Sequence, residues 1–116
     1  MSLTKRVLIA ENGVSRKHSK IITDLDKWIK PQITSNGERA RHLLRESDFD
    51  LLILDQDLPE SQLVAITADS EKVPTIITYS IIPDERFVKY PILAKLKQSD
   101  YKKLEKTIAS FYSLNQ

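Results

Sequence analysis

Short runs of consecutive apolar residues recur along the chain, and most of them end at a polar or charged residue. The clearest run covers residues 51–54 and leads straight into Asp55. Three similar runs and one shorter, more polar run cover residues 7–10, 75–79, 92–97 and 32–35. An unbroken apolar run is typical of a strand that is buried on both faces of a parallel sheet. The pattern therefore predicts five strands, with the polar one at an edge of the sheet.

Between these runs, apolar residues return at the spacing of a helix. The helices expected from this spacing cover residues 15–30, 38–45, 62–70 and 99–112, with one or two further turns near 84–88. Pro31 ends the first helix, because proline lacks the N–H that a helix interior requires. The third and fourth helices are short, and Ser99 is the expected N-cap of the last one.

Each predicted helix has one apolar face that we expect to be buried. In the helix over residues 38–45 the inward-facing residues are expected to be Ala40, Leu43 and Leu44. In the helix over 62–70 they are Leu63 and Ile66, and in the helix over 99–112 they are Tyr101, Leu104, Ile108 and Phe111.

The regular alternation of strands and helices predicts an α/β fold, a flavodoxin-like three-layer sandwich formed by one domain over residues 1–116. With right-handed crossovers, the parallel sheet takes the strand order 2-1-3-4-5. Ligand sites in such sheets lie at the carboxyl ends of the strands, where the strand order reverses. We therefore expect Glu11, Asn12 and Asp55 to converge in the crevice between the first and third strands.

Composition excludes several classes of protein. The 116 residues carry a net charge of +2 with acids and bases interspersed, which does not indicate nucleic-acid binding. The absence of cysteine excludes a disulfide scaffold and a thiolate metal site and is compatible with the cytoplasm. No apolar run is long enough to span a membrane. Two glycines are too few for a glycine-rich phosphate loop.

Three motifs give the chain a resemblance to a known family. They are Asp55-Gln56-Asp57-Leu58-Pro59, Asn36-Gly37-Glu38-Arg39-Ala40 and the first predicted strand with its polar pair Glu11-Asn12. Together with Lys97, seven residues before Leu104, these motifs resemble a response-regulator receiver domain over nearly the whole chain. The resemblance implies a cytoplasmic module of a two-component phosphorelay, a phosphoprotein that signals through protein contacts and is not an enzyme.

The same resemblance implies a role for each site residue. Asp55 would accept a phosphoryl group from a histidine kinase or phosphotransfer protein, and a downstream signalling protein would respond. Mg²⁺ would be held by Glu11, Asn12 and Asp55 and by the backbone carbonyl of Asp57. Lys97 would neutralise phosphoryl oxygens.

Several positions depart from the family pattern. Glu11 and Asn12 stand where two aspartates are usual, so one negative charge is lost and we expect weak Mg²⁺ binding. Tyr79 falls where the family has a switch hydroxyl. Strand alternation predicts that its neighbours Thr78 and Ser80 point away from the site, unless a bulge shifts them.

Other interpretations remain open. The chain could be a pseudo-receiver, an interaction module that works without phosphorylation. A small phosphotransfer or hydrolytic enzyme is disfavoured, since no second general acid or base is evident near Asp55 beyond Glu11. Structural roles are also available: Asp55 could cap the loop that follows it, Glu11 and Asn12 could cap a helix start, and Lys97 could be a solvated lysine.

Overall fold

The structure of the protein is a computed structural model that describes residues 5–12, 29–80, 83–89, 92–97 and 101–112. Five strands form one sheet in the order β2-β1-β3-β4-β5, and every neighbouring pair is parallel. The strands are β1 (Lys5–Ala10), β2 (Ile29–Thr34), β3 (Leu51–Asp55), β4 (Thr75–Tyr79) and β5 (Ile92–Lys97). The predicted sheet and its strand order are confirmed.

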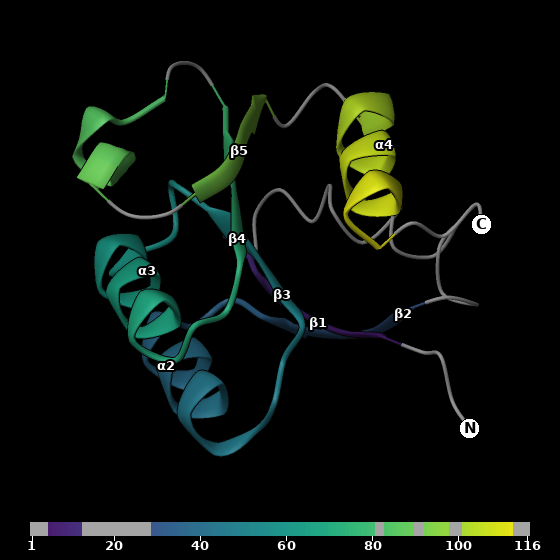
Figure 1. Ribbon diagram of the computed structural model, residues 1–116. Coiled ribbons are helices and arrows are strands. Elements are labelled where there is room, and N and C mark those ends of the chain that lie inside the picture. Colours follow the sequence, from purple (N-terminus) through teal and green to yellow (C-terminus); the bar gives the residue numbers. More distant parts are fainter. Residues whose placement is uncertain (1–4, 13–28, 81–82, 90–91, 98–100, 113–116) are drawn as a thin grey trace.

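The described helices cover both faces of this sheet (Figure 1). Helices α2 (Gly37–Glu46) and α3 (Ser61–Ser70) lie side by side on one face, and α4 (Tyr101–Tyr112) lies on the other. A short 3-10 helix, η1 (Glu85–Lys89), stands where the fourth helix was expected. The flavodoxin-like three-layer arrangement with short third and fourth helices is therefore confirmed. The predicted first helix lies almost entirely outside the described residues, and so do His18 and Trp28, which the sequence places in that helix.

Alternating residues of the strands divide the core into two halves. Leu52, Leu54 and Ile77 pack toward α2 and α3, together with Leu43 and Leu44 as predicted. On the opposite face, the strand residues Val7, Ile9, Leu51, Ile53 and Ile76 pack with Leu104 and Ile108 of α4. All five residues of β3 are buried, as expected of a central parallel strand.

The inward face of α3 was predicted wrongly. Leu63 and Ile66 are 42% and 44% exposed, while Val64, Ala65 and Ala68 are buried. Residues 63–66 are all apolar, so the sequence defines no single stripe on this helix. The smaller side chains face inward, where they allow α3 to lie close to α2 and the sheet.

Two helix ends also differ from the prediction. Ile29 and Lys30, expected at the end of the first helix, lie in β2 together with Pro31. Because β2 is an edge strand, it tolerates a proline that cannot donate to the sheet. In the last turn of α4, Phe111 is 36% exposed rather than buried. The side chain of Tyr101 and the expected cap Ser99 lie outside what the structure describes.

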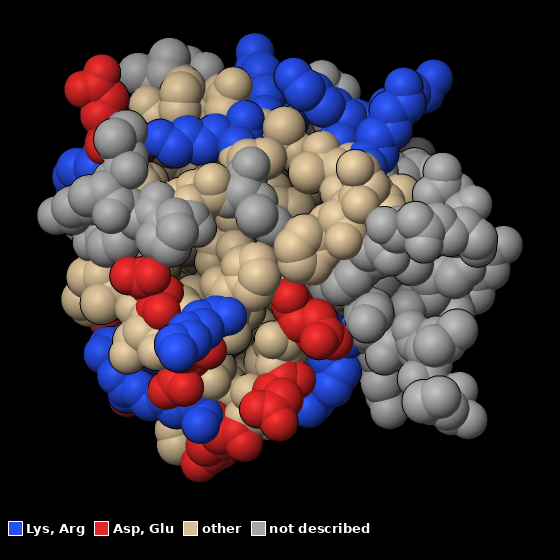
Figure 2. All heavy atoms as spheres, viewed as in Figure 1, with Lys and Arg blue, Asp and Glu red and all other residues tan. Residues whose placement is uncertain are grey.

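Charged side chains are unevenly spread over the face shown in Figure 2, where blue side chains gather along the rim formed by β5 and α4. The exposed lysines of these two elements are Lys97, Lys102, Lys103 and Lys106. Acidic and basic side chains alternate over the lower part of the same face. No helix in the described part of the chain is both long enough and apolar enough to cross a membrane.

Candidate functional site

Two buried carboxylates lie side by side at the carboxyl edge of the sheet. Asp55 is the last residue of β3 and is 1% exposed; Glu11 directly follows β1 and is 2% exposed. Ala10 and Leu54 are paired across these strands. Glu11 and Asp55 therefore take the next positions on strands about 4.8 Å apart, which is the convergence that the sequence predicted.

The Asp55 carboxylate is held by the backbone on both sides. The backbone N–H of Asn12 donates to its Oδ2 at 2.9 Å, and the backbone N–H of Asp57 donates to its Oδ1 at 2.9 Å. Each oxygen thus has a fixed direction, and the side chain joins the segment after β1 to the loop after β3. Asp55 thus caps its own loop, and both of its carboxylate oxygens have a fixed orientation at the edge of the sheet.

Two hydroxyl groups near the end of β4 have different partners, one in β3 and one in the loop that follows β3. Thr78, the register partner of Asp55, is fully buried, and its hydroxyl points at the Leu54 carbonyl oxygen, 3.5 Å away. The Ser80 hydroxyl donates to Asp57 Oδ2 at 2.8 Å. The expectation that Ser80 points away from the site is wrong, because Ser80 lies beyond the end of β4, where strand alternation no longer applies.

Lys97 and Tyr79 mark the far end of the same edge. They are register partners at the ends of β5 and β4. Lys97 is exposed and lies two strands away from β3, while Tyr79 is half-buried. The structure thus puts Lys97 on the expected edge of the sheet without joining it to the two buried carboxylates.

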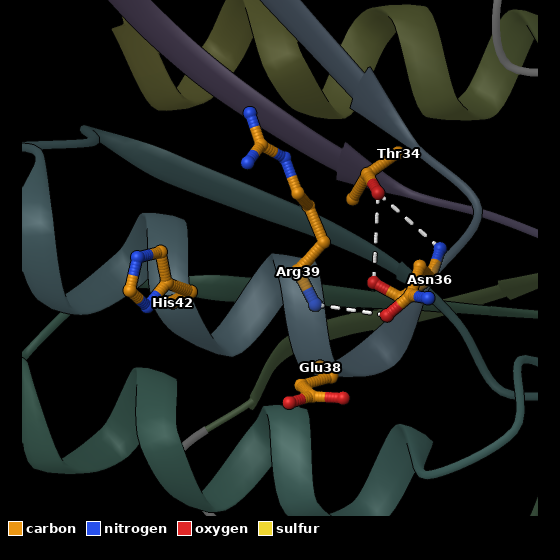
Figure 3. Close-up of a pocket in the computed structure, with 5 residues that line it drawn as sticks. All are labelled: Thr34, Asn36, Glu38, Arg39 and His42. Carbon is orange, nitrogen blue, oxygen red and sulfur yellow. Dashed lines mark hydrogen bonds between the residues drawn. The ribbon is translucent and has the colours of Figure 1, made fainter.

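The turn before α2 supports the site from the side of β2 (Figure 3). The Asn36 side chain accepts a hydrogen bond from the Arg39 backbone N–H at 2.9 Å, which caps α2. The Thr34 hydroxyl contacts the Asn36 backbone, and the Thr34 carbonyl accepts the Glu11 N–H at 3.0 Å. Glu38 and His42 complete the hollow drawn in Figure 3. Thr34 therefore joins the end of β2 both to the backbone of Glu11 and to the capped turn.

One contact was not anticipated from the sequence. Gln56 accepts a hydrogen bond from the Asp84 backbone N–H through its side-chain Oε1. The Arg86 guanidinium hydrogen-bonds the Asp84 carboxylate and lowers its pKa below the usual range. No sequence signal could have revealed this pair, because Gln56 lies between two motif residues and Asp84 lies in a loop without periodicity.

The donor set suits Mg²⁺ in kind, although it is poor in charge. Glu11 and Asp55 supply carboxylate oxygens and Asn12 a neutral amide oxygen, and hard divalent cations prefer oxygen ligands. Within the described ranges, no group of three or more His, Asp or Glu side chains could hold a metal ion. The residue types at this edge therefore suit the ion in chemical kind, but two carboxylates provide fewer anionic ligands than a cluster of three acids would.

Solved structures identify the fold. A response-regulator receiver domain protein of Methanospirillum hungatei superposes with a TM-score of 0.79 at 14% identity, covering 95% of this chain and 94% of that one. The N-terminal domain of a three-domain response regulator of Carboxydothermus hydrogenoformans gives 0.80 at 19% identity, covering 96% of each chain. The response regulator TrrA of Thermotoga maritima, solved with Mg²⁺ and beryllofluoride, gives 0.76 at 18% identity, covering 92% and 98%.

These neighbours are signalling modules of two-component systems, and the chain has the fold of their receiver domains. No protein-family model and no curated protein matches the sequence.

Proposed function

We propose that this receiver fold accepts a phosphoryl group on Asp55 from a phosphohistidine of a histidine kinase or phosphotransfer protein. The observation that carries the proposal is the Asp55 carboxylate, buried at the end of the central strand, oriented by two backbone N–H groups and adjacent to Glu11. The domain then signals through contacts with a downstream protein, in the cytoplasm and as a single unit over residues 1–116.

The transfer step requires little of the protein beyond position and charge. One carboxylate oxygen of Asp55 attacks the phosphorus atom, so a P–O bond forms as the P–N bond to the donor imidazole breaks. The electron pair of the broken bond stays on the imidazole nitrogen, which is then protonated by water. The N–H groups of Asn12 and Asp57 hold the carboxylate in its orientation while this occurs.

Mg²⁺ would be held by the side chains of Glu11, Asn12 and Asp55 and by the backbone carbonyl of Asp57. When bound, the ion neutralises charge on phosphoryl oxygens. Lys97, at the end of β5, would add a positive charge on the other side of the group.

A pseudo-receiver that binds partners without phosphorylation is the second candidate. It is favoured by the Asp55 hydrogen bonds, which also serve to cap the loop, and by the neutral Asn12. Both candidates are signalling modules, and they differ in whether Asp55 reacts.

Beryllofluoride binding separates the two candidates. With Mg²⁺ and beryllofluoride, a phosphorylatable receiver should show amide shift changes at Asn12, Asp55 and Asp57, and Asp55→Asn should abolish them because the amide is neither a nucleophile nor an anionic ligand. Asp69→Asn, an exposed aspartate on α3, is the matched control and should respond like the wild type. A wild-type protein with no response at these amides would support the pseudo-receiver.

A further inference from the structure

The two residues that follow Asp55 both reach the connection between β4 and β5. Gln56 accepts the Asp84 backbone N–H through its side chain, and Asp57 accepts the Ser80 hydroxyl at 2.8 Å. The backbone N–H of Gln56 also donates to the Thr78 carbonyl at 2.8 Å. The loop after β3 is thus joined to this connection at Ser80 and Asp84, and to the end of β4 at Thr78.

Within this connection, Asp84 and η1 are joined to each other by hydrogen bonds, and η1 is joined to the core by Phe87. The Asp84 carbonyl accepts the Phe87 N–H at 3.3 Å, and the Asp84 carboxylate accepts the Arg86 backbone N–H and guanidinium at 2.9 Å each. Phe87 is 1% exposed and packs in the core on the side of α2 and α3. Because Asp84 is hydrogen-bonded to Arg86 and Phe87, a change in its position would be passed on to η1.

The structure leaves room for such a movement. A cavity of about 560 Å³ lies beside Gln56, between the loop after β3 and the start of η1. The described residues that line it are Gln56, Pro83, Asp84, Glu85 and Arg86. Because Glu85 and Arg86 are exposed, a shift of η1 into or away from this space would alter the surface of the molecule.

We propose that Gln56, supported by Asp57, couples the state of the Asp55 carboxylate to the position of η1. This inference rests on the proposed function, since it assigns the route by which phosphorylation would change the surface. Phosphorylation of Asp55, which forms an acyl phosphate, removes negative charge from the carboxyl group that accepts the Asp57 N–H and so weakens that hydrogen bond. Residues 56 and 57 then shift, and the Gln56 side chain carries the shift to Asp84.

The test is a double-mutant cycle on the isolated chain, read by amide hydrogen exchange at Asp84 and Phe87. Gln56→Ala removes the acceptor and should speed exchange of the Asp84 amide by about fivefold, the equivalent of one ordinary hydrogen bond. Asp55→Asn removes the acceptor charge and should change exchange at both amides by about threefold or more in the wild-type background. In the Gln56→Ala background, Asp55→Asn should not change the exchange rates of the Asp84 and Phe87 amides.

Two further variants complete the design. Gln56→Glu keeps an acceptor for the Asp84 N–H and should restore the coupling, while Gln62→Ala, a half-buried glutamine on α3, should leave it unchanged. If Asp55→Asn alters η1 equally with and without Gln56, or in neither background, the coupling is overturned. Because this cycle needs no phosphoryl donor, it can fail while beryllofluoride still binds Asp55, and it can succeed where beryllofluoride does not bind.

Discussion

Gly37, the first residue of α2, lies directly against Pro59 in the loop that follows the candidate phosphorylation site. A Cβ placed on Gly37 would stand 2.7 Å from the Pro59 carbonyl oxygen and 3.1 Å from the Glu60 Cβ. The two sequence motifs that contain Gly37 and Pro59 are therefore two sides of one close backbone contact. This contact fixes the loop that carries Asp57 against the start of α2.

Gly37→Ala is expected to destabilise the protein by about 1–3 kcal/mol, because the new methyl group meets a backbone oxygen that cannot move aside cheaply. The measurement is the urea midpoint at unchanged m-value. Glu38→Ala, an exposed change one residue later, should stay within about 0.5 kcal/mol of the wild type. Equal midpoints for the two variants would show that the loop yields freely.

Asn36→Ala should cost about 1 kcal/mol of unfolding free energy, since it removes the side-chain acceptor of the Arg39 N–H at the start of α2. Asn36→Asp keeps an acceptor at the same place and should recover most of this loss. Thermal unfolding of the three proteins measures the effect. An Asn36→Ala variant as stable as the wild type would mean that the cap contributes nothing.

Asn12→Asp is expected to tighten Mg²⁺ binding by about tenfold, which is the effect of one added ligand charge in a partly solvated site. Asn12, whose side chain is neutral, follows the buried Glu11, and its backbone N–H donates to the buried Asp55 carboxylate. Calorimetric titration of both proteins with MgCl₂ gives the comparison. Identical affinities would show that the crevice does not use position 12 for the metal.

The pH dependence of η1 should follow Asp84. The hydrogen bonds and charge of Arg86 lower the pKa of Asp84 from its usual value of 3.8. A depressed carboxyl pKa means that this contact is fully present above pH 3.8 and is lost as the pH falls through the lower folded-state value. Carboxyl NMR titration should show the Asp84 pKa below 3.8 in the wild type and closer to it in Arg86→Gln. An unchanged pKa in that variant would exclude Arg86 as the cause.

Much of the fold could be predicted because strands that are buried on both faces of a parallel sheet consist of consecutive apolar residues. The apolar runs ending at Ala10 and Leu54 predict neighbouring strands, and the predicted strand order alone puts Glu11 beside Asp55. Where apolar residues were continuous around a helix, as at Leu63 and Ile66, the sequence could not define the buried face. The predicted second strand began too late, at residue 32, because Pro31 was interpreted as the end of a helix. In the structure Pro31 lies within β2, where an edge strand tolerates it.

The contacts within the site were less predictable. Asp55 itself was identified, but its partners Asn12 and Asp57 contribute backbone N–H groups, which carry no residue-specific signal. Ser80 and Gln56 depend on loop geometry, and a loop has no periodicity from which a side-chain direction could be derived. Lys97 was predicted on the correct edge of the sheet, and its role in phosphoryl transfer stays a prediction.

The central claim is that Asp55 accepts a phosphoryl group, and the most direct measurement is the intact mass of the protein after incubation with acetyl phosphate and Mg²⁺. We expect the wild type to gain the mass of one phosphoryl group. Asp57→Asn, which keeps the backbone carbonyl and changes only an exposed side chain, should gain it too, while Asp55→Asn should gain nothing. No gain in the wild type, or a gain that persists in Asp55→Asn, would contradict the account.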